Sequence, residues 1–207
     1  MRAVLLALSH RRFIGRLATR LPFTRPMVAR FIAGETLEAA LPALERIRDA
    51  GFHTSVDILG EAVRSEAAAR AAAAAYVAAI PVLAAQGLDH NVSLKLSQMG
   101  LALGPDLVRE NVARVLTAAA AAGAFVRVDM EDHTTIDATL ALWRELRPIM
   151  AGSGGVGVVL QSALRRTPAD AEALIAEGAR IRLCKGAYRE PASVAHQAKA
   201  DVDAAFV

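Results

Sequence analysis

Arg182-Leu183-Cys184-Lys185-Gly186-Ala187-Tyr188-Arg189-Glu190 is the stretch around which we interpret the rest of the chain. An apolar run that starts after Gly178 breaks into Lys-Gly-Ala-Tyr where a strand is expected to end. Buried parallel strands are rich in Val, Ile and Leu on both faces, so Arg182 and Lys185 depart from that pattern. Gly186 has no Cβ and would let a ligand ring lie flat on the backbone. The alternative is a strand end that carries two solvated cations.

The composition indicates one domain of ordinary globular size. The chain has 207 residues, of which 54% are hydrophobic, and much of that content is alanine in helix-favouring runs. Aromatic residues make up only 4% of the chain, and the net charge is a mild +3 without a long basic block. Stacking platforms for bases are therefore not expected, and nucleic acid is not a predicted partner.

The single cysteine, Cys184, allows no disulfide within the chain and fits a reducing cytosol. Residues 1–8 resemble the front of a signal peptide, but the Ser-His-Arg-Arg sequence at 9–12 cuts the apolar region short and no cleavage site follows. No apolar run reaches the length of a membrane span once alanine is discounted. The sequence therefore predicts a cytoplasmic protein.

Residues 1–50 are expected to form an N-terminal helical extension. Glu35–Ala50 has leucine and isoleucine at helical spacing, and Gly51 follows as a helix terminator. Before it, arginines alternate with apolar residues. This pattern favours an extension packed on the main domain, with a basic amphipathic surface for anionic lipid as the alternative. The arginines are Arg2, Arg11, Arg12, Arg16, Arg20, Arg25 and Arg30.

From residue 51 to 207 short apolar runs alternate with helical patterns. The expected strands are Phe52–Leu59, Asn91–Leu96, Phe125–Asp129, Gly155–Gln161 and Arg180–Cys184. The expected helices are Ser65–Ala85, Pro105–Ala122, Thr135–Met150, a helix capped by Thr167 that runs to Glu177, and a helix from Ala192 onward. Five such units predict an α/β fold with a parallel sheet, either doubly wound or part of a (β/α)8 barrel.

Each expected strand ends in a polar side chain. In a closed barrel these five ends would converge on one pocket. The glycines of residues 152–157 precede a strand, whereas a dinucleotide-binding loop follows one, so we interpret them as a turn. His133 lies beside two acids, but no second histidine pairs with it, and no metal site is predicted. The five strand-end residues are Asp57, Lys95, Asp129, Gln161 and Arg182.

At the same strand ends the chain resembles the proline dehydrogenase family, in its monofunctional bacterial form. The resemblance rests on five motifs in the family's order and spacing, and it runs from about residue 28 to the last residue. The motifs are Asp57-Ile58-Leu59-Gly60-Glu61, Ser93-Leu94-Lys95-Leu96-Ser97, Asp129-Met130-Glu131-Asp132, Val158-Val159-Leu160-Gln161 and Arg182-Leu183-Cys184-Lys185-Gly186-Ala187-Tyr188.

The resemblance implies a TIM-type (β/α)8 barrel that binds FAD and oxidises L-proline to 1-pyrroline-5-carboxylate. Hydride would pass from proline C5 to flavin N5, and electrons would go on to a membrane quinone, which makes a peripheral place on the inner face of the cell membrane an alternative location. A fixed guanidinium suits the negative charge of the reduced flavin. By resemblance, Asp129 and Arg182 are catalytic, and Lys95 and Tyr188 bind substrate. Met130, Gln161, Lys185, Gly186 and Ala187 bind the cofactor.

The expected domains are the helical extension, 1–50, and an incomplete barrel, 51–207. Five β–α units are present where a barrel has eight, and the family's Arg-Arg pair for the proline carboxylate has no counterpart. We therefore expect a fragment. Two alternatives stay open: an inactive remnant, or a barrel aldolase in which Lys185 or Lys95 forms a Schiff base. The oligomeric state is not predicted.

Overall fold

The computed structural model describes residues 32–60 and 62–207, which fall into two compact units that divide between His53 and Thr54. The first unit contains helix α4 (Leu37–Asp49). Thr36 caps this helix, because its hydroxyl oxygen accepts the N–H of Ala39 at 3.2 Å. The expected helix at Glu35–Ala50 is thus confirmed. The seven arginines of the predicted extension lie outside the described residues.

The second unit alternates strands and helices, as the sequence predicts. Its strands are β1 (Val56–Asp57), β2 (Asn91–Leu94), β3 (Phe125–Val128), β4 (Val156–Gln161) and β5 (Arg180–Cys184). Its helices are α5 (Glu66–Ala85), α6 (Pro105–Ala121), α7 (Ile136–Leu146), the 3-10 helix η1 (Arg147–Met150), α8 (Thr167–Ala176) and α9 (Lys199–Ala204). Ser65 caps α5 by accepting the N–H of Ala68 at 3.2 Å, and Pro105 starts α6.

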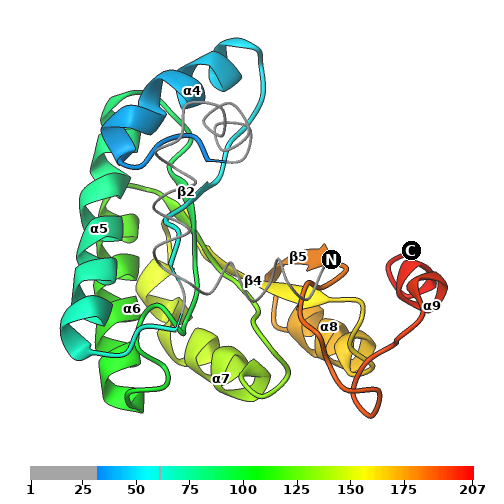
Figure 1. Ribbon diagram of the computed structural model, residues 1–207. Coiled ribbons are helices and arrows are strands. Elements are labelled where there is room, and N and C mark those ends of the chain that lie inside the picture. The colour runs from blue at the N-terminus through cyan, green and yellow to red at the C-terminus, as the bar shows by residue number, and fades with distance from the viewer. Residues whose placement is uncertain (1–31, 61) are drawn as a thin grey trace, which may run out of the picture. The chain divides into compact units, whose positions relative to one another are not determined.

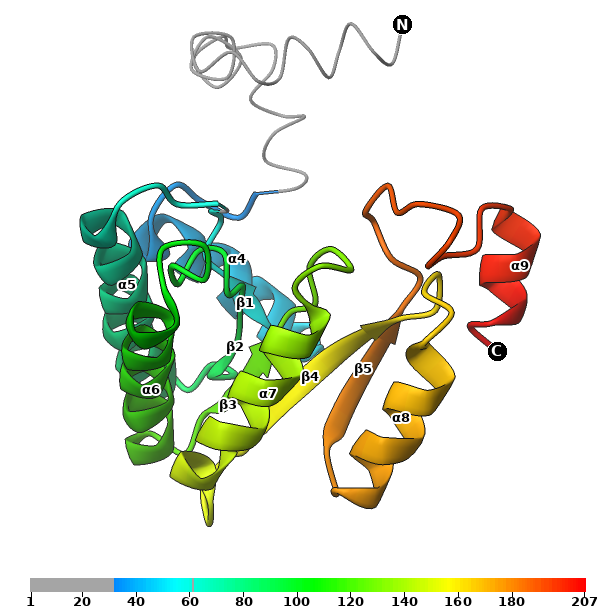
Figure 2. The ribbon, with the colours of Figure 1, turned by 90° about the horizontal axis from the view of Figure 1, so that it is seen from below.

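The five strands form one parallel sheet in the order β1-β2-β3-β4-β5. Because successive strands are neighbours and parallel crossovers are right-handed, the connecting helices must lie on the same face. Figures 1 and 2 show α5 to α8 along one side of the curved sheet. A doubly wound sheet would have helices on both faces, so the winding is that of consecutive units of a (β/α)8 barrel.

The register separates an apolar face from a polar one. Successive side chains of a strand point to opposite faces. The row on the helix-covered face is apolar throughout: Val56, Val92, Val126 and Val156. The next row faces the inner side of the sheet and is mostly polar: Asp57, Ser93, Arg127, Gly157 and Arg180. The core therefore lies between the sheet and the helices, and the inner face is left for polar chemistry.

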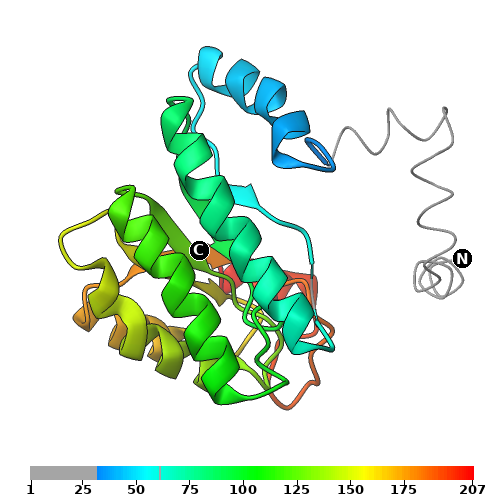
Figure 3. The same ribbon diagram turned by 90° about the vertical axis from the view of Figure 1, so that its left-hand side faces the viewer.

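Helix α5 has the length and apolar composition of a membrane-spanning helix, and it is the one such helix among the described residues. It packs against α6, as Figure 3 shows. One side of α5 is completely buried, including Tyr76, Ile80 and Leu83, and the small residues Ala69 and Ala73 allow close packing. Its composition is thus also that of a core helix in a β–α unit.

Strand β1 is much shorter than the expected strand Phe52–Leu59, and that expectation is wrong. Backbone donors on either side of the two strand residues bond to side chains instead of a neighbouring strand. The N–H of Thr54 donates to Asp89 at 2.8 Å, and the N–H of Ile58 donates to the hydroxyl of Tyr76 at 3.2 Å. The apolar residues of this stretch predict a strand, but they do not show that side chains compete with a neighbouring strand for these backbone donors.

Two expectations about helix ends are also wrong. The expected helix Thr135–Met150 becomes a 3-10 helix from Arg147 onward, where Pro148 cannot donate a backbone hydrogen bond. Thr167 does not cap α8: Arg166 holds that position, and the Thr167 hydroxyl donates to the carbonyl of Gln161 at 2.5 Å.

The expectation of a helix from Ala192 onward is also wrong, because the chain directly after Ala192 is not helical. The N–H groups of Val194 and Ala195 both donate to the carbonyl of Pro191 at 3.1 Å, which makes a turn. The N–H of His196 then donates to Ala163 at 2.8 Å, across to the loop after β4. These tertiary bonds delay the helix until Lys199, where α9 begins.

Candidate functional site

The inner face carries a second row of side chains, just beyond the ends of β2 and β3. The pairs Leu94–Val128, Val128–Val158 and Val159–Arg182 set the register. The N–H of Asp129 donates to Leu94 at 2.8 Å and continues the ladder by one residue. Lys95 and Asp129 therefore fall in one row with Val159 and Arg182, four neighbouring positions on four strands.

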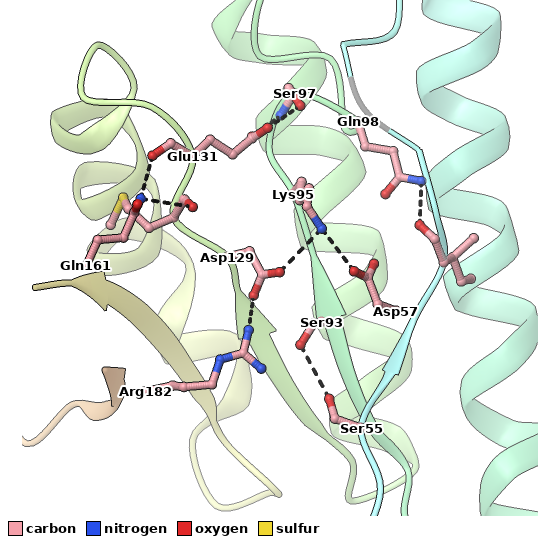
Figure 4. A network of polar contacts seen from close by, with 12 residues as sticks. Ser55, Asp57, Ser93, Lys95, Ser97, Gln98, Asp129, Glu131, Gln161 and Arg182 are labelled. Carbon is pink, nitrogen blue, oxygen red and sulfur yellow. Dashed lines mark hydrogen bonds and ion pairs between the residues drawn. The ribbon is translucent and has the colours of Figure 1, made fainter. Parts of the chain in front are cut away.

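Three of these residues and Asp57 form a continuous chain of ion pairs, shown in Figure 4. The Nζ atom of Lys95 lies 2.9 Å from Oδ2 of Asp57 and 3.4 Å from Oδ2 of Asp129. The other oxygen of Asp129 pairs with Nη2 of Arg182. The charges thus alternate from β1 to β5, and each shared group holds the next one in place.

Burial and neighbouring charges move the pKa values of this chain in opposite senses. Burial by itself would lower the pKa of Lys95, but the hydrogen bond and charge of Asp57, helped by Asp129, raise it. Burial raises the pKa of Asp129, against the opposing charges of Arg182 and Lys95. A proton acceptor of raised basicity therefore lies beside an ammonium group that holds its proton firmly.

Arg182 is the exposed end of the chain of ion pairs. Its side chain is 43% exposed, whereas that of Asp129 is 15% exposed. Within the described residues, its bond to Asp129 uses Nη2 and leaves the other guanidinium donors for a ligand. Its charge also adds to burial in lowering the pKa of Arg127, one row away on the same face. The face around Arg182 is thus biased toward positive charge and suits an anionic group.

Gln161 is held in a third row at the end of β4. It is 3% exposed, and its Nε2 donates to the carbonyl of Glu131 at 2.7 Å and to that of Met130 at 3.3 Å. Because both bonds use the amide nitrogen, the amide oxygen is the atom left to meet Gly186 or a ligand. A Cβ added to Gly186 would lie 2.7 Å from that oxygen.

The segment after β5 brings the remaining predicted residues to the surface. Gly186 has a φ of +102°, a conformation that side chains rarely adopt. Lys185 turns toward α9, where its Nζ lies 2.5 Å from Asp203 and 5.5 Å from the ring centre of Phe206. Ala187 and Tyr188 are exposed.

The structure thus places the predicted residues in two groups. Lys95, Asp129 and Arg182 are in direct contact. Gln161 contacts the backbone of Met130, which is buried, and lies against Gly186. Lys185, Ala187 and Tyr188 belong to the same exposed segment as Gly186, but the charge of Lys185 is already paired.

Sequence reasoning gave no role to several residues that support the site. Asp57 was noted as a strand end but not as the nearer partner of Lys95. The buried Tyr76 donates to the carbonyl of Ser93 at 2.7 Å, and Gln98 donates to that of Ile58 at 2.9 Å, which ties β1 to β2. A tyrosine within the alanine-rich stretch of α5 was the one signal available in the sequence.

Glu131 is a further residue to which the sequence gave no role. It is 7% exposed. Its carboxylate accepts the N–H of Ser97 at 2.8 Å and the hydroxyl of Ser97 at 2.5 Å. Since the carbonyl of the same residue accepts from Gln161, Glu131 connects the loops after β2, β3 and β4. Across residues 32–60 and 62–207, no group of three or more His, Cys, Asp or Glu side chains could hold a metal ion.

Comparisons with known proteins agree on one family. A family model described as proline dehydrogenase matches residues 40–202. Proline dehydrogenase of Deinococcus radiodurans is 39% identical over 180 residues, which cover 86% of this chain and 58% of that protein. Proline dehydrogenase 2 of Bacillus subtilis strain 168 is 34% identical, and the match covers 87% of this chain and 58% of that protein.

A solved structure shows the same fold. The crystal structure of proline utilization A (PutA) from Bdellovibrio bacteriovorus inactivated by N-propargylglycine matches with a TM-score of 0.78 and 26% identity, over 88% of this chain and 24% of that one. The chain spans about 58% of the length of the two relatives above. With the family model matched over most of its length, the chain belongs to the proline dehydrogenase family.

Proposed function

We propose that this chain carries flavin-binding and substrate-binding groups for the FAD-dependent oxidation of L-proline to 1-pyrroline-5-carboxylate. The observation that carries the proposal is the row of Lys95, Asp129 and Arg182 on the inner face, in a chain of this family. In the reaction, proline loses a hydride from C5 and a proton from its amine, and a C=N bond forms between them. The two electrons pass on to a quinone, which takes up two protons.

The residues fit a flavin by the chemistry of their donors. FAD, when bound, accepts the hydride and becomes more negative. Arg182 is a permanent cation with donors to spare, and Asp129 holds it in position before any ligand arrives. Gln161 offers an amide oxygen whose orientation is set by its own two donated bonds. Gly186 presents exposed backbone without a Cβ.

Lys95 and Asp129 are suited to managing the amine proton of proline. The amine must be neutral before C5 can release hydride, so a group that accepts a proton near the substrate favours the reaction. The pKa of Asp129 is raised by burial even with Arg182 and Lys95 beside it. The exposed Tyr188 lies on the segment that would cover the substrate.

The pKa of Lys95 argues against the aldolase alternative. A Schiff base forms from a neutral amine, and enzymes that use one depress the pKa of their lysine. Asp57 and Asp129 instead raise the pKa of Lys95. The nitrogen of Lys185 is already engaged in an ion pair with Asp203.

The test is to add FAD to the purified chain, remove free flavin by desalting, and record the absorbance spectrum. Retained flavin is the expected result, and bleaching of that flavin by proline without oxygen would favour the dehydrogenase over the aldolase. A chain that stays colourless, or trapping of a carbonyl substrate by borohydride, would contradict the proposal. Turnover with proline and a dye acceptor then separates an active chain from an inactive remnant. A quinone acceptor and a place on the inner face of the membrane remain predictions, tested with quinone and lipid vesicles in the same assay.

A further inference from the structure

Glu190 has a buried carboxylate that lies outside the chain of ion pairs. Its side chain is 4% exposed. One carboxylate oxygen accepts the backbone N–H of His133 at 2.9 Å, and the other bonds to the ring Nδ1 of the same residue. A single histidine thus satisfies both oxygens, and we call this contact the His133–Glu190 pair.

Loss of these hydrogen bonds would destabilise the fold, because the Glu190 carboxylate would stay buried without partners. A carboxylate taken out of water loses its hydration, and only strong hydrogen bonds compensate for the loss. His133 belongs to the loop after β3, and Glu190 belongs to the chain after β5. The pair therefore ties two loops together past the strand that separates them. Both loops lie at the same end of the sheet in Figure 2.

The chain between β5 and Glu190 is fixed at both ends and exposed between them. At the first end, the carbonyl of Lys185 accepts the N–H of Ala163 at 3.0 Å. At the second end stands the pair with His133, and Gln197 supports it by donating to the carbonyl of Glu190 at 3.2 Å. Residues 186–189 between these anchors are all exposed. Loss of the second anchor would leave this segment attached on one side only.

We propose that the His133–Glu190 pair is a positioning device for the segment Gly186–Tyr188. The inference rests on the proposed function, because this segment is the one expected to meet flavin and substrate. His133 lies four residues after Asp129 on the same loop, so the pair sets the exposed segment relative to the carboxylate of the site. His133 and Glu190 act through the backbone they hold.

Trypsin cleavage tests the anchor without any ligand, because the bond after Lys185 joins that residue to Gly186, the first residue of the segment. We expect Glu190→Ala and His133→Ala each to speed cleavage at this bond about tenfold or more, and the double variant to add little. Glu190→Gln keeps an acceptor for the N–H of His133 and should show a smaller increase. Glu172→Gln, an exposed acid on α8, is the control.

Two results would overturn the anchor. One is wild-type cleavage after Lys185 in Glu190→Ala with native Trp143 fluorescence. The other is an equal increase at every trypsin site, which would mean general destabilisation. FAD binding is measured separately on the same variants, with an expected increase in Kd of about tenfold. Faster cleavage with an unchanged Kd would refute the positioning role. A wild-type chain that binds no FAD would refute the proposed function, while the cleavage rates still decide the anchor.

Discussion

Asp57 makes the shorter ion pair of Lys95, with 2.9 Å between Oδ2 and Nζ. After burial, which acts in the opposite sense, its hydrogen bond is the largest influence on the pKa of Lys95. The strand with the fewest sheet pairs therefore supplies the closest counter-charge of the site, and this relationship can be tested directly.

Asp57→Asn should lower the pKa of Lys95 and the stability of the chain. The raised pKa contributes stability that is present below the unfolded value of about 10.4 and is lost as pH rises through the folded value. We expect a loss of about 1 kcal/mol at pH 7, since the pair is only partly buried. Urea unfolding at several pH values measures this loss. The difference in unfolding free energy between the variant and wild type should narrow above a pH of about 10.4.

Asp106→Asn is the matched control for that change, because its ion pair with Arg109 is at the surface and Asp106 itself is 96% exposed. Its effect should stay within about 0.5 kcal/mol. An Asp57 variant as stable as this control would show that the ion pair between Asp57 and Lys95 makes no net contribution to stability.

Gly186→Ala should destabilise the chain more than Gly178→Ala. Both glycines have positive φ, +102° and +71°. Nothing lies within 4 Å of a Cβ added to Gly178, so only backbone strain of about 1–2 kcal/mol is expected there. At Gly186 the added atom also meets Gln161, which should raise the total to about 2–4 kcal/mol. Equal losses in urea unfolding would mean that the side chain of Gln161 yields freely.

Tyr76→Phe should cost about 1–2 kcal/mol near neutral pH, because the carbonyl of Ser93 loses a buried donor. Burial, followed by the charge of Asp57, raises the pKa of Tyr76. The unfolded chain then ionises this phenol above pH of about 10 while the folded chain does not, so wild-type stability falls as pH rises. The Phe variant lacks this dependence. The two unfolding free energies should converge between about pH 9 and 11, and a constant gap would contradict the prediction.

Arg182→Met should slow flavin reduction by proline on the order of 10²-fold, as expected for loss of a fixed cation that stabilises developing charge. Arg182→Lys keeps the charge but not the planar donors and should recover only part of the rate. Stopped-flow absorbance of the flavin measures both. Reduction at the wild-type rate in the Met variant would remove Arg182 from the mechanism.

The sequence predicted strands β2 to β5 well, because apolar runs rich in β-branched residues end at polar ones. The prediction of one row of strand-end residues followed from parallel pairing, and the structure places Lys95, Asp129 and Arg182 together. The choice of partners did not follow. Asp57 for Lys95 and Asp203 for Lys185 depend on how segments far apart in sequence approach each other.

Local competition for backbone groups explains the other differences. Around β1 and after Ala192, side chains and loops take hydrogen bonds that a strand or helix would otherwise use. Thr167 illustrates the same effect, because its hydroxyl serves the carbonyl of Gln161 instead of the helix start. A one-dimensional pattern carries no information on such long-range acceptors.

The two-residue length of β1 has a consequence for the dynamics of the site. Only two residue pairs join β1 to β2, so side-chain bonds from Tyr76 and Gln98 supply much of its attachment. Segments with few backbone bonds open locally at a lower free energy than the rest of a fold, and their amides exchange hydrogen fastest. Each such opening would carry Asp57 away from Lys95 and leave Asp129 behind. The net charge of the group that remains, Lys95, Asp129 and Arg182, would then change each time β1 opens, on the timescale of local unfolding.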